Sequence, residues 1–538
     1  MNRSTLLTKS RLWLLAFLIL IGPGGGMGSW AKEGARRAKV PKQPPREFQF
    51  LAYFYSDAVM NNIFAGNDFL NGQTVGRLFG GNTTTTAGFE SFFMQQRLIP
   101  FFIFQPKLLD GRALLRASFE IDWTWGDRSY GTGGNTGGAF SADQVNIQTQ
   151  NIEVELIPYP GLTVNLGLQR LFDTPYNPYR TFFSTMTYTG YRLAFWGSDA
   201  AGITLRYDRD FTRFKLGYYQ LYENRIQERD DVGLWEFMAE RDLTPTWRQG
   251  VSLWYVNDRG NGQGGVSILG QGLNSLLNDY NGVFRFPLGN TPDAPYKADI
   301  FWIGTFWHRN PEFTLGRWML TGFGITNRGK VRVESGDEEQ TTDIAGYAAN
   351  LRLGYRHGQT AEDVVTVDLL YASGDGDTLR DGQYSGIITG NTYGSPGAIF
   401  ISHGAYLLLP HGNVVNRFVA AVNDLSNIGL GFLGGTVNVY KSLIPHKLSV
   451  KVGAAAAVSE HAPPEGGKTL GREINARIRF QPRVFMDVEV HAAYLWLGDF
   501  YTSSAVNGKR ERRTDPPMRT EKPHNPWTVL LTFKWLMF

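Results

Sequence analysis

Charged side chains recur at every second position in many short segments of the chain, and side chains spaced in this way share one face of a strand. A face lined by bases would attract anionic groups of a solute, whereas a face that carries both signs would hold its charges in pairs. The bases are Arg116, Arg206, Arg213, Lys215, Arg352, Arg356, Arg477 and Arg479. The acids in such positions are Glu120, Asp122, Glu153, Glu155, Asp208, Asp368, Asp487 and Glu489. The two signs are balanced, so both interpretations stay open.

Motifs of enzyme chemistry are scarce in this sequence. Its 538 residues include no cysteine, which excludes disulfide scaffolds, thiolate zinc sites and cysteine nucleophiles. Residues 429–434 match the glycine pattern of nucleotide-binding loops, but they run into the strand-like segment 436–440, where that fold needs a helix. His491 lies near Asp487 and Glu489, and a structural role is expected for it. We therefore expect a protein that is not an enzyme, with no catalytic residues, no cofactor and no metal.

The first 31 residues have the composition of a secretory signal peptide. Three bases precede an apolar run over 12–21, and Ser29 and Ala31 are small residues that suit a signal peptidase. The run is shorter than the roughly 20 residues of a spanning helix, so a membrane anchor is the weaker alternative. The whole chain carries a net charge of +4, and the part after residue 31 is close to neutral. Without a basic excess, nucleic-acid binding is not expected.

Apolar and polar residues alternate with period two in many short segments, for example over 152–156, 162–168 and 448–456. Each of these segments predicts a strand with one apolar face. A soluble β-sandwich would give the same pattern, so the alternation alone does not distinguish a sandwich from a barrel.

Aromatic residues favour the barrel. The last segment, 527–538, is an aromatic-rich strand that ends in Phe538, as outer-membrane barrels do, although Phe538 lies on the opposite face from the apolar series. Pairs such as Trp302 with Trp307, and Tyr494 with Trp496, occur at expected strand ends. An interfacial aromatic girdle would place them there.

Short and long connections alternate along the chain, as they do in barrels with periplasmic turns and external loops. The expected short turns are 106–111, 158–161, 208–210, 242–247, 309–315, 356–362, 441–447 and 481–483. The expected long segments are 56–87, 126–144, 171–199, 222–230, 257–297, 327–343, 372–427, 459–470 and 498–526. Together they predict an all-β fold, a transmembrane antiparallel β-barrel of the outer membrane with about 18 strands. We expect a signal peptide over 1–31, a short periplasmic segment over 32–45 and a single barrel domain over 46–538.

One hairpin allows a prediction of register. A three-residue turn at 481–483 would pair Ile478 with Met486 on the lipid face and Arg477 with Asp487 on the lumen face. Arg477 would then be held by Asp487, whereas Arg479 would be the freer of the two bases.

Several segments resemble the alginate export porin family, single-chain outer-membrane barrels that release an anionic polyuronate. Residues 167–172 resemble the Gly, Gln, Arg strand end of the family, and residues 202–206 resemble its next strand. Residues 367–375 resemble its Tyr-Ala-Ser-Gly-Asp segment, and residues 471–475 with 494–500 resemble its hairpin near the C-terminus. The resemblance implies a conduit lined by arginines, with Arg170, Arg206, Arg352 and Arg477 as the positional candidates. Arg170 falls on the apolar register, so it fits only where its strand bends or ends.

Two long loops carry more apolar residues than exposed loops should. Residues 398–425 include the runs 406–409 and 418–422, and we expect this loop to pack into the barrel mouth as a constriction. Residues 266–280 carry leucines at helical spacing and could fold inward or lie over the mouth. A basic cluster at 509–513 could contact lipopolysaccharide or lie solvated.

These observations predict a channel in the outer membrane of a Gram-negative-type bacterium, for passage or export of anionic or sugar-like solutes such as alginate. A general diffusion porin without polysaccharide specificity is an alternative, and an outer-membrane barrel hydrolase is a weaker one. The expected partners are outer-membrane lipid and lipopolysaccharide, the solute and the barrel assembly machinery.

Overall fold

The computed structural model describes residues 47–65, 84–125, 145–171, 198–223, 226, 228, 231–259, 296–335, 338–360, 362–377, 382–388, 404–408, 427, 429–507 and 523–537. Residues 1–46, which hold the expected signal peptide, and the terminal Phe538 lie outside this part.

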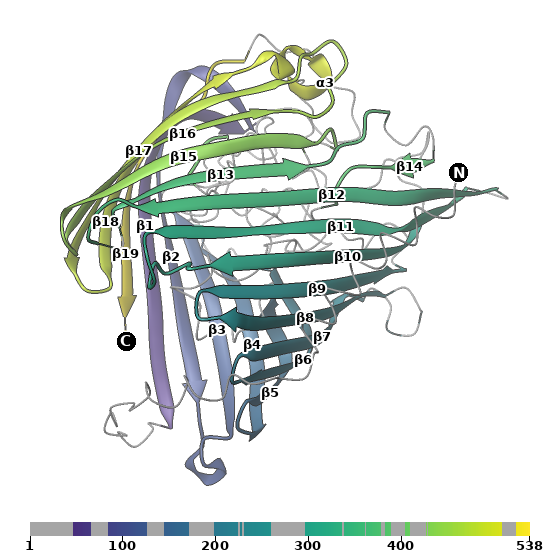
Figure 1. Cartoon of the computed structure of the whole chain (residues 1–538), viewed down its shortest axis with the longest axis vertical. Helices are drawn as coiled ribbons and strands as arrows, with labels where there is room; N and C mark the ends of the chain where they lie inside the picture. The colour runs from purple at the N-terminus through teal and green to yellow at the C-terminus, as the bar shows by residue number, and fades with distance from the viewer. Residues whose placement is uncertain are drawn as a thin grey trace.

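Almost all of the described residues belong to strands (Figure 1). The strands in the first half are β1 (Phe48–Ala65), β2 (Thr84–Phe104), β3 (Ala113–Thr124), β4 (Val145–Tyr159), β5 (Leu162–Leu171), β6 (Ser198–Arg209), β7 (Thr212–Tyr222), β8 (Val232–Thr244) and β9 (Trp247–Asp258). Those in the second half are β10 (Tyr296–Arg309), β11 (Trp318–Ser335), β12 (Glu338–Arg356), β13 (Val364–Ala372), β14 (Gln383–Tyr384), β15 (Phe432–Ile444), β16 (Leu448–Val458), β17 (Thr469–Arg483), β18 (Met486–Leu497) and β19 (Trp527–Met537). The short helices are η2 (Lys107–Leu109), η6 (Asp499–Thr502) and α3 (Ser504–Asn507).

The strands form one closed cylinder. Each strand pairs antiparallel with the next along the chain, β13 pairs with β15, and β1 pairs with both β2 and β19. The two-residue β14 lies parallel to β12 and is not part of the wall ring. The described residues therefore build an 18-stranded antiparallel barrel, as the alternation of connection lengths predicts. Closure leaves no open edge, so the backbone groups of the wall are paired within the protein.

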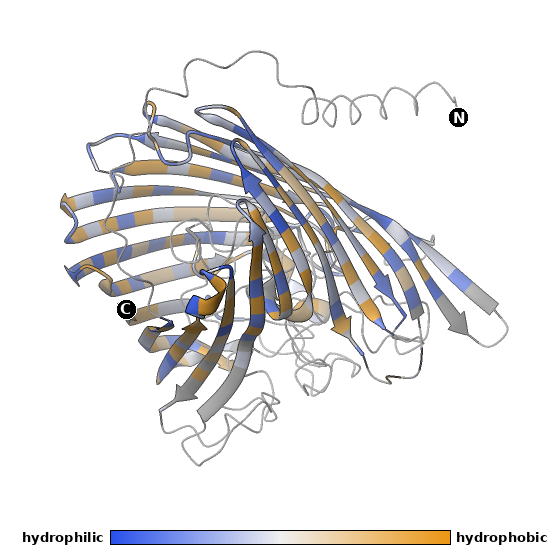
Figure 2. Cartoon of the chain, turned by 90° about the horizontal axis from the view of Figure 1, so that it is seen from below, coloured by the Kyte–Doolittle hydropathy of each residue, from blue (hydrophilic) through white to orange (hydrophobic). Residues whose placement is uncertain are grey.

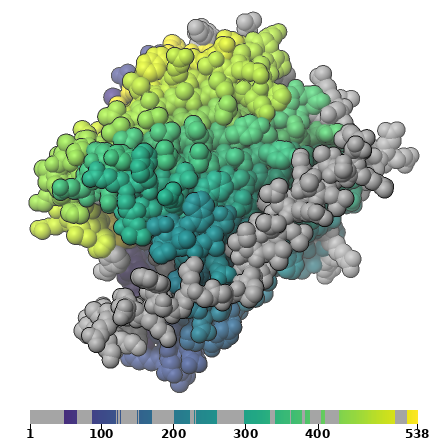
Figure 3. All heavy atoms as spheres, viewed as in Figure 1, coloured from purple at the N-terminus to yellow at the C-terminus, as the bar shows by residue number. Residues whose placement is uncertain are grey.

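The outer surface of the barrel is apolar. Leu166, Val452 and Ile474 are 37%, 62% and 53% exposed, whereas the alternate residues Asn165, Lys451 and Glu473 are buried on the inner face. Figure 2 shows this alternation as bands of apolar and polar colour along each strand. In the space-filling view, the side chains form a continuous surface over the strands coloured green and yellow (Figure 3). A closed barrel with an exposed apolar surface is the architecture of an outer-membrane protein, and this is where the chain resides.

The helices of the described residues span three or four residues each, and none of them could cross a membrane.

The connections between strands lie at or next to the predicted short turns, except the last one, which lies at 484–485 instead of 481–483. The N-terminal end of β1 and the C-terminal end of β19 both lie at this turn end of the barrel. Two of the long segments, 56–87 and 327–343, are shorter as connections than predicted, because strands extend into both of their ends. Strand β1 continues to Ala65 and β2 starts at Thr84, while β11 continues to Ser335 and β12 starts at Glu338. Contacts across each hairpin hold these extensions together. The rings of Phe64 and Phe89 lie 4.5 Å apart, and Lys330 lies 3.6 Å from Asp343.

The predicted register of the hairpin at 481–483 is also wrong. Ile478 pairs with Val490 and Arg479 with Glu489, and the turn itself lies at residues 484–485. The register shifts between Phe480 and Arg483, a stretch that contains Pro482. Proline has no N–H to donate to the ladder and is confined to such irregular positions in strands. The shift relative to the expected register is an even number of residues, so each side chain stays on its predicted face.

The inner face is not polar everywhere. On β8–β11 it carries mainly apolar side chains that are fully buried, among them Leu234, Trp254, Ile300 and Trp302. We call these residues the apolar wall. Trp302 is therefore not part of an interfacial girdle as predicted, because it points inward and donates its indole N–H to the carbonyl of Ile388 at 2.8 Å. The lumen is thus partly filled, and it is not the uniformly wet interior that the sequence suggests.

Candidate functional site

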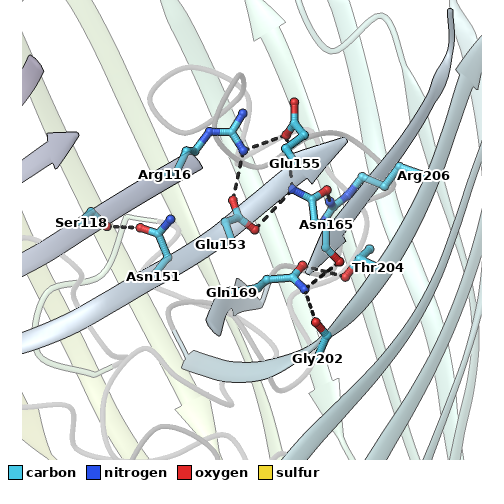
Figure 4. A network of polar contacts seen from close by, with 10 residues as sticks. All are labelled: Arg116, Ser118, Asn151, Glu153, Glu155, Asn165, Gln169, Gly202, Thr204 and Arg206. Atoms are coloured by element: carbon cyan, nitrogen blue, oxygen red, sulfur yellow. Dashed lines mark hydrogen bonds and ion pairs between the residues drawn. The ribbon is translucent and has the colours of Figure 1, made fainter. Parts of the chain in front are cut away.

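The charged inner face begins with an ion triad on β3 and β4. Arg116 and Glu153 are register partners, and Glu155 lies two residues further along the same face of β4. Arg116 Nη1 lies 3.0 Å from Glu153 Oε1 and 2.7 Å from Glu155 Oε2 (Figure 4). All three side chains are buried. Arg116 is therefore held by two carboxylates.

The network continues over β5 and β6. Asn165 donates from Nδ2 to both Glu153 and Glu155 at 3.3 Å, and it accepts at 2.7 Å from Arg206 Nη1 (Figure 4). Gln169 accepts from Thr204 at 2.8 Å and donates to the carbonyl of Gly202. Arg206 thus contacts an amide in this network, and the amide links it to the acids. The amide residues have no charge to mark them in the sequence, and only their inward register could have shown them.

Strands β7–β9 add two further groups of ion pairs. Lys215 lies 2.6 Å from Glu236, and both side chains are almost completely buried. Arg213 lies 3.1 Å from both Glu240 and Asp242, and Asp242 in turn lies 2.9 Å from Arg248. We call the inner-face residues of β3–β7, with these carboxylate partners on β8, the polar wall.

The second half of the barrel places its arginines in the same way. Arg352 donates to Asp368, its register partner on β13. Arg356 stands at the end of β12, and its guanidinium lies 5.9 Å from the centre of the Phe313 ring. Both arginines face inward as predicted, and Arg352 is bound to an acid.

The predicted roles of Arg477 and Arg479 are reversed. Arg479 contacts Asp487 at 2.9 Å and Glu362 at 2.7 Å, so it is the more tightly held of the two. Arg477 lies 3.8 Å from Glu489. The shifted register at Pro482 is the reason, because it moves Asp487 away from Arg477 and towards the turn beside Arg479.

Arg170, the remaining predicted arginine, lies near the end of β5. It pairs with Asp199 in the backbone register of β5 and β6, one residue before β5 ends. Its side chain lies outside the described part.

The inner charges near the turn end are more accessible than those deeper in the wall. The side chains of Arg248, Asp242, Arg479 and Asp487 are 20–26% exposed, whereas that of Lys215 is 1% exposed. A partly hydrated, charged vestibule thus lies at the turn end of the barrel. Because its bases and acids are paired, its field is weaker than that of an arginine-lined pore.

Three further charged residues of the inner face were not predicted as site residues. Lys451, Glu473 and Lys534 all lie on inner faces, and Lys534 contacts Glu489 at 2.8 Å. Glu473 shares the register of Arg477, so the period-two pattern could have shown it.

Two pieces of the long β13–β15 connection fold into the barrel. Ile387 and Ile388 are fully buried next to the apolar wall, and residues 405–408 are buried against β16–β18. The prediction that the 398–425 loop packs inward is confirmed for residues 404–408. The rest of that loop, the leucines of 266–280 and the basic cluster at 509–513 lie outside the described residues.

Among the described residues, no three histidine, aspartate or glutamate side chains come together in a way that could hold a metal ion. The carboxylates of the inner face instead bind arginine, lysine, amide and backbone donors.

No family model matches the chain, and no curated protein matches it. Among solved structures, the chain is similar to OccAB4 of Acinetobacter baumannii, with 10% sequence identity, 92% of this chain and 98% of that chain covered, and a TM-score of 0.46. A BenF-like porin from Pseudomonas fluorescens Pf-5 shows 10% identity, coverage of 91% and 98%, and a TM-score of 0.46. The outer membrane channel DcaP of Acinetobacter baumannii shows 10% identity, coverage of 91% and 97%, and a TM-score of 0.39.

Proposed function

We propose that this protein is an outer-membrane channel for small hydrophilic solutes, with anionic or sugar-like solutes as the preferred class. The observation that carries the proposal is the charged, partly exposed vestibule inside a barrel whose outer surface is apolar. A barrel of about 18 strands is wide enough to enclose an aqueous path. The inward-folded pieces at Ile387–Ile388 and 405–408 would narrow that path.

A polyuronate such as alginate is the finer proposal, and it comes from the family resemblance alone. The inward Arg206 supports it, because its guanidinium contacts an amide and guanidinium groups bind carboxylates well. The ion pairing of Arg116, Arg213 and Arg479 favours the second candidate, a general diffusion porin without polysaccharide specificity.

Single-channel recording in planar bilayers tests both candidates. A conducting pore that prefers anions and is blocked by uronate oligomers would support the solute class that we propose. Conductance with weak selectivity and no block would support the general porin. Absence of conductance from correctly folded protein would overturn the channel, and a clear cation preference would contradict the role of the arginines.

We also infer that the exposed apolar rows contact outer-membrane lipid, including lipopolysaccharide, and that the barrel assembly machinery inserts the chain. The aromatic strand β19, which closes the barrel against β1 and exposes 40% of Trp535 on the outer face, supports the second inference. Removal of residues 535–538 should leave the protein protease-sensitive and outside the membrane fraction. Normal insertion of that variant would contradict it.

A further inference from the structure

Residues Gly404–Leu408, which we call the lumen segment, cross the inner face of β16–β18. Ala405, Leu407 and Leu408 are fully buried, and Tyr406 is 4% exposed. The ring of Tyr406 meets the ring of His491 edge-on, with the centroids 5.2 Å apart. The segment is therefore packed against the wall inside the barrel.

A single carboxylate binds three successive backbone N–H groups of this segment. Glu473 Oε1 accepts from Tyr406 N at 2.7 Å, and Oε2 accepts from Leu407 N at 2.9 Å and Leu408 N at 2.7 Å. Asn475 Nδ2 adds a fourth hydrogen bond to Oε1 at 2.7 Å. Successive N–H groups that converge on one point form a concave anion site, and hydrogen bonds to an ionised acceptor are stronger than neutral ones.

The other end of the lumen segment is held by a base. Lys451 Nζ donates to the carbonyl of Gly404 and to Asn475 Oδ1, and it lies 4.2 Å from the centre of the Tyr406 ring. Lys451 and Glu473 therefore hold the two ends of the segment, and Asn475 connects them on the wall.

We propose that the N–H groups of Tyr406, Leu407 and Leu408 form a carboxylate-binding site, which Glu473 fills as a built-in ligand. Glu473 thereby latches the lumen segment to the inner face of β17. A buried N–H group without an acceptor costs folding free energy. If the Glu473 side chain is removed, the three backbone N–H groups therefore need another acceptor, which is either an external carboxylate or water. Water can accept these hydrogen bonds only if the lumen segment moves into a hydrated space. A small monocarboxylate such as acetate can instead occupy the position of the missing carboxylate.

Removal of the built-in ligand tests this site in the full-length protein in planar bilayers. Glu473→Ala should raise the single-channel conductance by about twofold, because the constriction is released. Acetate should return the conductance towards the wild-type value. It should do so at concentrations of about tens of millimolar, because a free ligand must match the high effective concentration of the tethered carboxylate that it replaces. Chloride or nitrate at equal ionic strength should not do so. Asp208→Ala serves as the control, since it removes an exposed acid of the inner face, and its conductance should not respond to acetate.

If the wild type conducts, the proposal is wrong when Glu473→Ala leaves the conductance unchanged, or when acetate and chloride act alike on that variant. The conductance measurement rests on the proposed channel function. A second measurement, which does not need a conducting channel, tests the carboxylate site by itself. The thermal unfolding midpoint of Glu473→Ala should be lower than that of the wild type, and acetate but not chloride should raise it, because a ligand that binds the folded state stabilises it. That result would support the carboxylate site even if the wild type did not conduct, and its absence in folded protein would overturn the site.

Discussion

The polar wall and the apolar wall are built from neighbouring strands with the same alternation, yet their inner faces differ in chemistry. On the polar wall, the charged side chains that the structure describes are held in ion pairs or by amides, as Arg116 is by Glu153 and Glu155. On the apolar wall, Trp254 and Trp302 are fully buried. Apolar side chains are driven out of water, so this part of the wall needs a covering layer. The pieces of chain that fold into the lumen supply part of it, as the contact between Trp302 and Ile388 shows.

The alternation of polar and apolar residues therefore predicts on which face of the wall a residue lies. It does not predict whether that face contacts water or packed side chains. An inner face can line a hydrated path or support a packed plug. In this barrel, the partly exposed vestibule is suited to the first role and the apolar wall to the second.

The largest expected effect is a cavity in the apolar wall. Trp302→Ala should lower the free energy of unfolding by about 3–5 kcal/mol, because it removes a fully buried ring and its hydrogen bond to Ile388. Denaturant unfolding in lipid or detergent measures it. Phe301→Ala on the outer face, where the ring is 38% exposed, should cost clearly less. Equal losses would mean that the apolar wall is not a packed core.

The buried ion pair of the polar wall should behave differently when it is broken and when it is replaced. Lys215→Met alone should cost about 3 kcal/mol of unfolding free energy, because it leaves the Glu236 carboxylate buried without its base. The double variant Lys215→Met with Glu236→Gln should recover most of this loss. If the double variant is as unstable as the single one, the pair itself stabilises the polar wall.

A smaller effect is expected at the turn end, outside both walls. Asp363 lies in the turn between β12 and β13, where it contacts Lys441 at 2.9 Å and accepts from the backbone of Thr360 and Ser442. The ammonium group of Lys441 and these N–H groups hold the pKa of Asp363 well below its usual value. Asp363→Asn should therefore cost about 1–3 kcal/mol of unfolding free energy near neutral pH.

The pH dependence of this contribution has a defined sign. Because the pKa is lower in the folded state, the stabilisation is present above the usual aspartate pKa of about 4 and is lost as pH falls towards the folded value. Unfolding midpoints of wild type and Asp363→Asn should therefore converge in acid. A constant difference between pH 7 and pH 3 would contradict the ionised contact.

The smallest effect concerns selectivity on the polar wall. Arg206→Ser removes a base whose guanidinium contacts the amide of Asn165, so the cation to anion permeability ratio should rise by about twofold or less. Reversal potentials in a salt gradient measure it. Leu166→Ser on the outer face should leave the ratio unchanged, and an equal shift in both variants would exclude Arg206 from the solute path.

Much of the barrel could be predicted because it depends on local pattern. The rows at 152–156, 162–168 and 448–456 face outward or inward as expected. The short turns lie at or next to their predicted positions, except the one predicted at 481–483. The ends of β11 and β12 were mistaken for a loop, because they carry polar residues that pair with each other across the two strands. The ends of β1 and β2 were mistaken as well, although there an apolar stretch of β1 pairs with threonines of β2.

The candidate site was predictable in its faces and not in its contacts. Arg352 and Arg479 point inward as expected, but the partner of Arg479 depends on a register shift at Pro482 that no alternation reveals. The bond between Glu473 and residues 406–408 joins parts of the chain more than 60 positions apart, and it could not be inferred from either part alone.

The sequence by itself determined which residues lie on the two sides of the wall, because the strand repeat of two is fixed by backbone geometry. Together with the connection lengths, this repeat also determined that the wall is a membrane barrel. Only the tertiary structure decided which inner positions are hydrated, which charges are paired and which pieces of chain enter the lumen. Those properties depend on strand register and on contacts between distant segments, and neither is encoded in local periodicity.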